Sequence, residues 1–282
     1  MGEARAVIHR TFTSGADPES VLRGDVRAPD GPSPDTAIVV VHGFKGFKDW
    51  GFFPYLCERL ADAGHAVVSF NLSHNGIGDD PLEFTELERF ARNTLSRELD
   101  EVQDVIDEVL SGSLLGEVPR ALGVVGHSRG GGQAVLATAE HDGIDALVTW
   151  AAVADFDRWS AELRAEWRDT GRIFVSNART GQQMPLDVTL LEDLEANRDR
   201  LDIEAAARRL AVPWLVVHGL DDETVAAEEG RRLAGWGGDT AFVGIAGAGH
   251  TFQARHPFSG APPELEQAID ETIAHFAEHL RD

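Results

Sequence analysis

Residues 126–130, with the sequence GHSRG, constrain the fold of this chain more than any other feature. They follow the apolar run 121–125 and precede the segment 131–137, which predicts a strand, a tight turn carrying Ser128, and a helix. Glycines on both sides of the serine let the strand and the helix approach closely while the turn strains the serine backbone. This arrangement is typical of a nucleophile elbow, which exposes the serine hydroxyl at the carboxyl edge of a sheet. The alternative interpretation is an ordinary Gly-rich turn between a strand and a helix.

Predicted strands and helices alternate along most of the chain. We predict strands at 37–41, 66–70, 121–125, 146–150, 214–217 and 240–245, and helices at 52–63, 86–110, 224–235 and 263–280. Two alternating segments, 6–12 and 21–28, are expected to form an antiparallel hairpin at the sheet edge. Alternation of strands with helices produces a parallel sheet from βαβ units. The sequence therefore predicts an α/β fold with a mostly parallel, twisted sheet of about eight strands and helices on both faces.

One region interrupts this alternation. The residues between 153 and 213 are polar and rich in predicted helix, and they contain no clear strand. A long insertion at the carboxyl edge of a sheet is usually functional. We therefore expect residues 1–153 and 213–282 to form the core, and residues 154–212 to form a small helical lid over the site.

Charge limits the possible partners of the protein. The chain has 282 residues, enough for one large or two small domains, and its 25 basic and 48 acidic residues give a net charge of −23. Nucleic acids and anionic membranes both need a basic surface, so the charge argues against both as partners. Only two basic residues are lysines and 23 are arginines. Two explanations stay open: a high-salt source, where salt screens the repulsion between carboxylates, or a genome whose codons favour arginine.

A single cysteine, Cys57, excludes an intramolecular disulfide and is expected to be a buried small hydrophobic residue. The sequence shows no apolar run of membrane-spanning length and no apolar segment of the signal-peptide type near Met1. We therefore expect a cytoplasmic protein.

A serine nucleophile needs a base to take its proton and an acid to orient that base. Asp221 and Asp222 follow the predicted strand 214–217, and His250 lies in a Gly-rich loop after the strand 240–245. Because the carboxyl ends of parallel strands share one edge, these side chains are expected to converge on Ser128 in the order Ser, Asp, His. Taken singly, the aspartate could instead cap the following helix and the histidine could be exposed to solvent.

These residues resemble the α/β-hydrolase superfamily, and within it the dienelactone-hydrolase-like and feruloyl/cinnamoyl-esterase-like groups. The resemblance covers nearly the whole chain from about residue 20 and implies the fold described above. The acid loop of this superfamily reads G-x-x-D-x-x-V, and residues 219–225 match it with Asp222, rather than Asp221, at the acid position. Dienelactone hydrolases proper carry a cysteine nucleophile, and dehalogenases and epoxide hydrolases an aspartate. Ser128 departs from both patterns.

An oxyanion hole supplies two backbone N–H groups to the negative oxygen that develops during acyl transfer. One should belong to Arg129, the residue after the nucleophile, and the resemblance places the other at Phe44 in the loop after strand 37–41. We expect His42 to hydrogen-bond within that loop and His127 to pack away from the nucleophile. Lys45, Lys48 and Trp50 are expected to border the acyl pocket.

The sequence predicts no metal and no cofactor. It has neither a P-loop nor a G-x-G-x-x-G motif after the first strand. Histidine can bind metal ions, but six further histidines are not spaced with Cys, Asp or Glu residues in the way that metal ligands are: His65, His74, His141, His256, His275 and His279.

The sequence thus predicts a serine hydrolase that cleaves a small-molecule carboxylic ester through an acyl-serine intermediate. Two alternatives remain. A peptidase or aminopeptidase of the same fold would need an anionic lid residue such as Glu166, Asp187 or Asp193 to hold a substrate amine. A ligand-binding protein would carry the same three residues without using them. The oligomeric state stays open.

Overall fold

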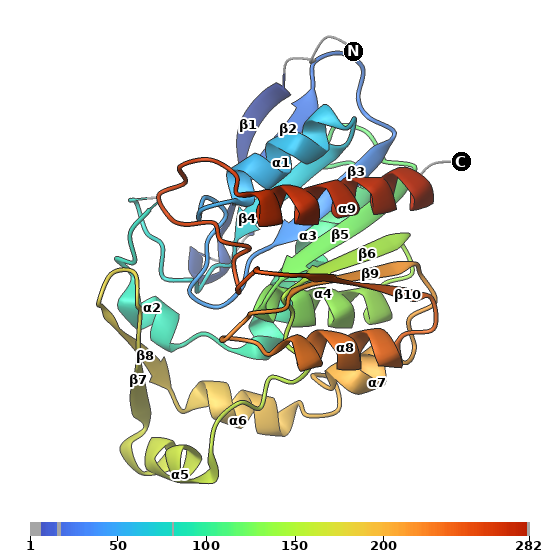
Figure 1. Ribbon diagram of the computed structural model, residues 1–282. Helices are drawn as coiled ribbons and strands as arrows, with labels where there is room; N and C mark the ends of the chain where they lie inside the picture. Colours follow the sequence, from blue (N-terminus) through green and yellow to red (C-terminus); the bar gives the residue numbers. More distant parts are fainter. Residues whose placement is uncertain (1–6, 16–17, 81, 281–282) are drawn as a thin grey trace.

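The computed structural model describes residues 7–15, 18–80 and 82–280 and contains one eight-stranded sheet (Figure 1). Its strand order is β1-β2-β4-β3-β5-β6-β9-β10. The strands are β1 (Val7–Ser14), β2 (Leu22–Pro29), β3 (Thr36–Val41), β4 (Ala66–Asn71), β5 (Ala121–His127), β6 (Ala146–Trp150), β9 (Trp214–Gly219) and β10 (Thr240–Ile245). Strand β2 runs antiparallel to β1 and β4, and the remaining pairs are parallel. This confirms the predicted sheet and its edge hairpin, whose first predicted residue, Ala6, lies outside the described residues.

Helices cover both faces of the sheet because its central strands are apolar on both sides. Every residue of β3, β4 and β5 is buried. Helices α1 (Phe53–Asp62) and α9 (Pro263–His279) pack on one face, and α3 (Leu95–Leu110), α4 (Arg129–Glu140) and α8 (Ala227–Trp236) pack on the other (Figure 1). None of the helices in the described part of the chain is both long and apolar enough to cross a membrane.

The predicted helix 86–110 is interrupted. It consists of α2 (Leu87–Ala91) and α3, and Thr94 caps the start of α3 by accepting the Arg97 N–H at 3.3 Å. A threonine that binds the backbone in this way favours a helix start over a helix interior. Apolar residues continue at helical spacing across the break between α2 and α3, so the hydrophobic pattern alone did not reveal the interruption.

The segment between β6 and β9 contains strands as well as helices, which corrects the expectation that it has none. Helix α5 (Ala161–Thr170) leads into an antiparallel hairpin, β7 (Arg172–Ser176) and β8 (Gln183–Asp187), and α6 (Thr189–Ala196) and α7 (Ile203–Ala207) follow. The buried Trp167 fastens α5 to the hairpin by donating its indole N–H to the Leu186 carbonyl at 2.9 Å. Helix α7 packs against α4. Helix α5 and the hairpin lie at the carboxyl edge of the sheet, and α6 and α7 lead back along the side of α4 and α8 toward the start of β9 (Figure 1).

Candidate active site

Ser128 occupies a sharp turn between β5 and α4. Its backbone has φ 59° and ψ −122°, a conformation that is costly for a residue with a side chain. The surrounding glycines make the turn possible, because a Cβ at Gly126 would overlap the Gly130 carbonyl and a Cβ at Gly130 would overlap the His42 carbonyl. The sequence GHSRG therefore folds into the predicted elbow, with Ser128 immediately before the first turn of α4.

The structure brings Ser128, Asp222 and His250 together. His250 Nε2 lies 3.0 Å from Ser128 Oγ, and His250 Nδ1 lies 2.8 Å from Asp222 Oδ2. An ionised carboxylate can only accept, so Nδ1 donates to Asp222 and Nε2 is free to accept the serine proton. Asp221 is exposed, and its N–H donates to the Ala248 carbonyl at 2.9 Å. The geometry thus places Asp222, and not Asp221, beside the histidine.

The Asp222 carboxylate is held from several sides. Its side chain is fully buried, and Oδ1 accepts the N–H groups of Thr224 and Val225 at 2.8 and 2.9 Å. Helix α8 begins at Ala227, three residues after the predicted start at 224. Burial alone would raise the pKa of Asp222, but the contacts with His218 and His250 and these backbone donors hold it below its ordinary value. The group is therefore ionised and oriented at neutral pH.

His218 is a second histidine beside Asp222 that the sequence analysis did not assign. Its ring is completely buried, with Nε2 2.9 Å from the Val225 carbonyl and 3.5 Å from Asp222 Oδ2. A Cβ at Gly230 would collide with this ring, so that glycine of α8 makes room for it. Its position at the end of β9, four residues before the acid, is the sequence signal that could have identified it.

His127 supports the loop that carries the base. Its Nε2–H donates to the His250 carbonyl at 2.9 Å, and the two rings lie 4.9 Å apart. Phe52 and Phe53 pack against the edge of the imidazole. Burial lowers the pKa of His127 to about 3, with the neighbouring His250 adding to the shift. His127 therefore packs as expected, and it also makes one hydrogen bond to the backbone carbonyl of His250.

The loop after β3 passes in contact with the elbow. His42 Nε2 accepts the Leu72 N–H at 3.2 Å, so its Nδ1 carries the proton and donates to the Gly43 carbonyl at 3.0 Å. Burial lowers the pKa of His42, which keeps this ring neutral. A Cβ at Gly43 would lie 2.8 Å from Ser128 Cβ and 3.3 Å from the Arg129 nitrogen. Gly43 therefore lies against the elbow, and the peptide of Phe44 follows it directly in the chain.

Arg129 contributes both its backbone and its side chain to this region. It is the first residue of α4, and N–H groups at a helix start have no acceptor within the helix. Its guanidinium lies 4.0 Å from the centre of the Phe44 ring and 3.2 Å from Glu98 Oε1. Glu98 is buried and also accepts from Asn93 and Gln133. These contacts fix Phe44 and Arg129, the two residues predicted to form the oxyanion hole, against each other.

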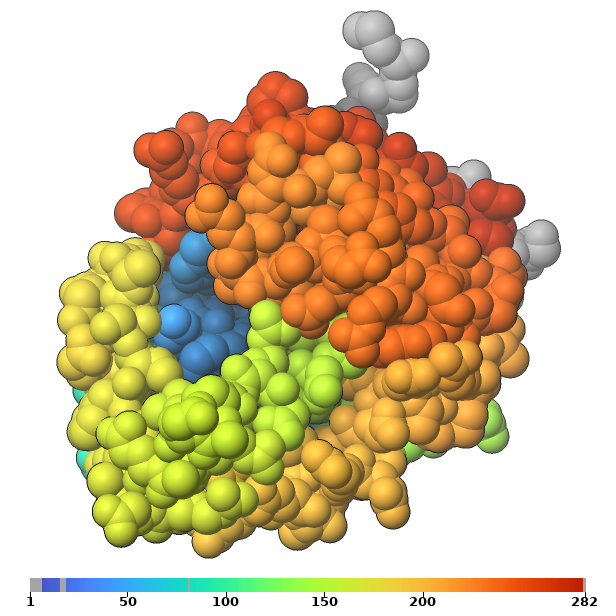
Figure 2. All heavy atoms as spheres, turned by 60° about the horizontal axis from the view of Figure 1, so that its bottom comes forward, coloured from blue at the N-terminus to red at the C-terminus, as the bar shows by residue number. Residues whose placement is uncertain are grey.

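A cavity of about 190 Å³ opens beside these two residues. It is lined by Phe44, Arg129, Val153, Phe156, Arg158, Trp159, Val175 and Leu186. Figure 2 shows the face at this edge of the sheet hollowed between the yellow and yellow-green inserted segment and the orange segments after β9, with blue atoms of the early part of the chain inside the hollow. Lys45, Lys48 and Trp50, which were expected at the acyl pocket, are not among the residues that line this cavity. Lys48 is bound to Asp25 and Asp49, and Trp50 packs on Phe52 and His256.

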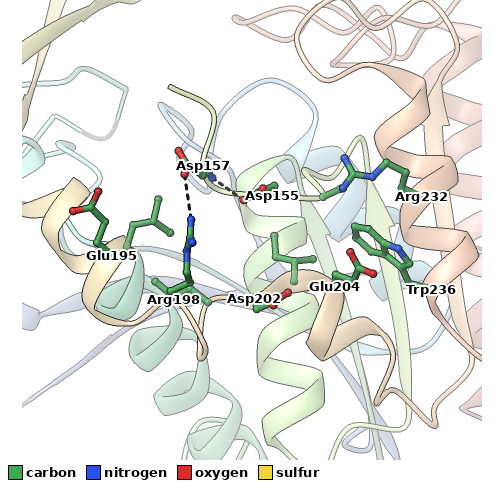
Figure 3. A pocket seen from close by; sticks show the side chains of 12 residues that line it. Asp155, Asp157, Glu195, Arg198, Asp202, Glu204, Arg232 and Trp236 are labelled. Atoms are coloured by element: carbon green, nitrogen blue, oxygen red, sulfur yellow. Dashed lines mark hydrogen bonds and ion pairs between the residues drawn. The ribbon is translucent and has the colours of Figure 1, made fainter. Parts of the chain in front are cut away.

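A larger cavity, of about 310 Å³, lies on the other side of the loop that follows β6. Figure 3 shows its carboxylates and two arginines, with Arg198 paired to Asp157. The lining includes residues of α6, α7 and α8 but neither Phe44 nor Arg129, the residues beside Ser128 that line the smaller cavity. This cavity is therefore separate from the candidate active site.

Within the described ranges, the structure holds no group of three or more His, Cys, Asp or Glu side chains arranged to hold a metal ion. His65 contacts Thr36, His74 contacts Ser73, and His141 contacts Asp107. His256 accepts the Gly51 N–H, and the rings of His275 and His279 lie next to each other on α9.

Comparison with known protein families matches residues 38–262 to the alpha/beta hydrolase family, and this chain belongs to that family. The match includes Ser128, Asp222 and His250. A relative in sequence, 2,6-dihydropseudooxynicotine hydrolase from Paenarthrobacter nicotinovorans, is 23% identical over 201 residues, or 70% of this chain and 47% of the relative. The chain thus spans about half the length of that protein.

Solved structures share the fold. Est1E from Butyrivibrio proteoclasticus is 20% identical, with a TM-score of 0.68 and coverage of 96% of this chain and 98% of Est1E. A dienelactone hydrolase from Anabaena variabilis is 16% identical, with a TM-score of 0.64 and coverage of 98% and 99%. The protein is therefore an α/β hydrolase by sequence family and by architecture, as its resemblance implied.

His127 makes the stability of the folded protein depend on pH. Its pKa is about 3 in the folded protein and 6.5 when exposed, so between these values the unfolded chain binds a proton that the folded protein excludes. The stability contributed by neutral His127 is complete above pH 6.5 and declines as the pH falls toward 3. We predict that the free energy of unfolding lost in His127→Gln shrinks by about 2 kcal/mol from pH 7 to pH 5. Urea unfolding of both proteins at each pH measures it, and a loss independent of pH would contradict the assignment.

Proposed function

We propose that this α/β hydrolase is a serine hydrolase that cleaves small-molecule carboxylic esters. The observation that carries the proposal is the position of His250, whose two ring nitrogens lie within hydrogen-bonding distance of Ser128 Oγ and Asp222 Oδ2. A serine becomes a nucleophile when a base takes its proton during attack, and the carboxylate holds that base in the required tautomer.

Acylation follows from these contacts. His250 Nε2 takes the proton of Ser128 as Oγ attacks the ester carbonyl carbon, and Asp222 stabilises the imidazolium that forms. The N–H groups of Phe44 and Arg129 donate to the oxygen that becomes negative. His250 then gives its proton to the alcohol oxygen as the bond to the carbonyl carbon breaks, which leaves an acyl-Ser128.

Deacylation reverses the roles with water in place of the alcohol. His250 removes a proton from water as it attacks the acyl carbon, and the collapse of the second tetrahedral intermediate returns a proton to Ser128 Oγ. The products are a carboxylic acid and the free serine. The chain's own residues and water account for each step, so the proposal includes no cofactor and no metal.

Features of the inserted segment favour an ester over an aminoacyl substrate. Asp187 is paired with Arg172, and Asp193 accepts the Ser96 N–H. Glu166 is exposed on α5, and none of these three carboxylates lines the cavity beside Phe44. An aminopeptidase needs an anion in that position to hold the substrate amine. Est1E, whose fold the chain shares, has been solved with bound ferulic acid, a carboxylic acid, which supports an acyl substrate here as well.

The substrate class can be tested with aryl esters that differ in acyl length, including an aromatic acyl series, beside aminoacyl aryl amides. We expect turnover of esters, little turnover of amides, and a fall of about 10³-fold or more in kcat for Ser128→Ala, since its hydroxyl is the proposed nucleophile. Spectrophotometric release of the aryl alcohol measures kcat and KM. Preferred turnover of the amides would favour the peptidase. Binding of an ester without any turnover would favour a ligand-binding role.

The identity of the acid can be tested with a matched pair of substitutions. Asp222→Asn removes the charge that orients His250 and should lower kcat by about 10³- to 10⁴-fold. Asp221→Asn changes an exposed neighbour and should leave kcat within a few-fold of the parent protein. Steady-state ester kinetics of the two proteins decide between them, and a larger loss for Asp221→Asn would exchange the two assignments.

A further inference from the structure

The two lysines of the chain both lie in the loop after β3, whereas the other 23 basic residues are arginines. Their surroundings differ. Lys48 Nζ is 2.7 Å from a carboxylate oxygen of Asp25 and 2.7 Å from one of Asp49. Lys45 Nζ donates to the Ser176 carbonyl at 3.0 Å, and no carboxylate of the described residues lies within ion-pair distance of it. Lys45 thus differs from Lys48 in having no carboxylate partner among the described residues.

Lys45 lies at the border of the cavity beside the elbow. Its Nζ is 5.5 Å from the centre of the Phe44 ring, and its bonded partner Ser176 follows Val175 at the end of β7. Phe44 and Val175 both line the cavity. The ammonium group therefore lies where the loop after β3 meets the inserted hairpin, partly exposed, with two of its three N–H groups available to a ligand.

The two arginines that line this cavity are each paired with a carboxylate. Arg129 pairs with Glu98, and Arg158 makes two hydrogen bonds to the carboxylate of Glu229. The remaining lining is mostly apolar or aromatic. The local charge is thus one uncompensated positive charge at the edge of an apolar cavity.

We propose, on the basis of the ester hydrolysis proposed above, that the preferred substrate carries a carboxylate which binds Lys45 while the rest of the substrate occupies the cavity beside Phe44. One uncompensated cation matches a singly charged carboxylate, whereas a doubly charged phosphate would leave one negative charge unpaired. An ammonium–carboxylate hydrogen bond is stronger than a neutral one, and the partly enclosed position limits screening by water.

The electrostatics around Lys45 agree with this geometry. Burial, and to a smaller extent the positive charge of Arg129, lower the pKa of Lys45. A bound carboxylate would oppose this lowering of the pKa, since it supplies an opposite charge close to the ammonium group.

The test compares pairs of esters that differ only in charge. Monoaryl esters of five- to eight-carbon dicarboxylic acids carry the carboxylate on the acyl side, and acetates of hydroxybenzoic acids carry it on the alcohol side. The matching carboxamides are neutral and nearly the same shape. We expect kcat/KM of the carboxylate ester, divided by that of its matching carboxamide, to exceed one in one of the two series. That series identifies the part of the substrate that lies beside Lys45. Lys45→Met and Lys45→Gln should lower that ratio about tenfold, mainly through KM, and Lys45→Arg should retain most of it.

Arg208→Met is the matched control, because it also removes one positive charge but from an exposed pair with Glu204 on α7. Its ratio should equal that of the parent protein. Ratios that respond equally to Lys45→Met and Arg208→Met, or not at all, would overturn the carboxylate site while leaving ester hydrolysis intact.

A binding measurement keeps this inference separate from catalysis. Calorimetric titration of the Ser128→Ala protein with glutarate and adipate monoamides and with hydroxybenzoates should detect binding that weakens about tenfold when Lys45→Met is added. Absence of binding by all of these acids would overturn the inference. Absence of turnover of every ester, with binding preserved, would instead contradict the proposed function.

Discussion

The buried carboxylate of Asp222 is the group on which the rest of the site depends. It accepts two backbone N–H groups of its own loop and one N–H of His250, and His218 lies beside it. A carboxylate without such donors would be protonated at this depth, because burial disfavours the charged form. The loop after β9 therefore folds around its own anion, and that anion fixes the imidazole that faces Ser128.

Neutral histidines form the support behind this charged pair. His127 holds the His250 carbonyl, and His42 joins the loop after β3 to the Leu72 backbone. Burial lowers the pKa of both rings, so neither competes with His250 for a proton during attack by the serine. The site thus contains several histidines in contact with its loops, but only one has both an acid and a hydroxyl as partners.

The parts predictable from sequence are those determined by local pattern. The elbow was predicted because Gly126 and Gly130 allow contacts that a Cβ would block, and these contacts are present. The acid and the base were expected because both follow strands that end at the same edge. The structure brings their side chains together with Ser128, while their catalytic roles remain predictions.

The parts that sequence could not predict depend on distant contacts or on strands that lack a strand-like pattern. Strand β8 contains Pro185 between two apolar residues, and β7 has three consecutive apolar residues of which Phe174 is exposed, so in neither strand do apolar residues alternate with polar ones. The contact between Lys45 and Ser176 joins positions 131 residues apart. Helix α3 begins at Leu95 within an apolar pattern that runs through the break, and only the Thr94 side chain marks it. In each case the deciding interaction exists only once the chain has folded.

Ser128 is the proposed nucleophile of this hydrolase. The most direct measurement is reaction of the native protein with a fluorophosphonate probe, followed by mass spectrometry of the labelled peptide, with heat-denatured protein as the control. We expect a single adduct on Ser128 that forms only in the native protein, because the probe reacts with a serine whose proton is taken by a positioned base. An adduct on another residue, or a native protein that does not react, would contradict it.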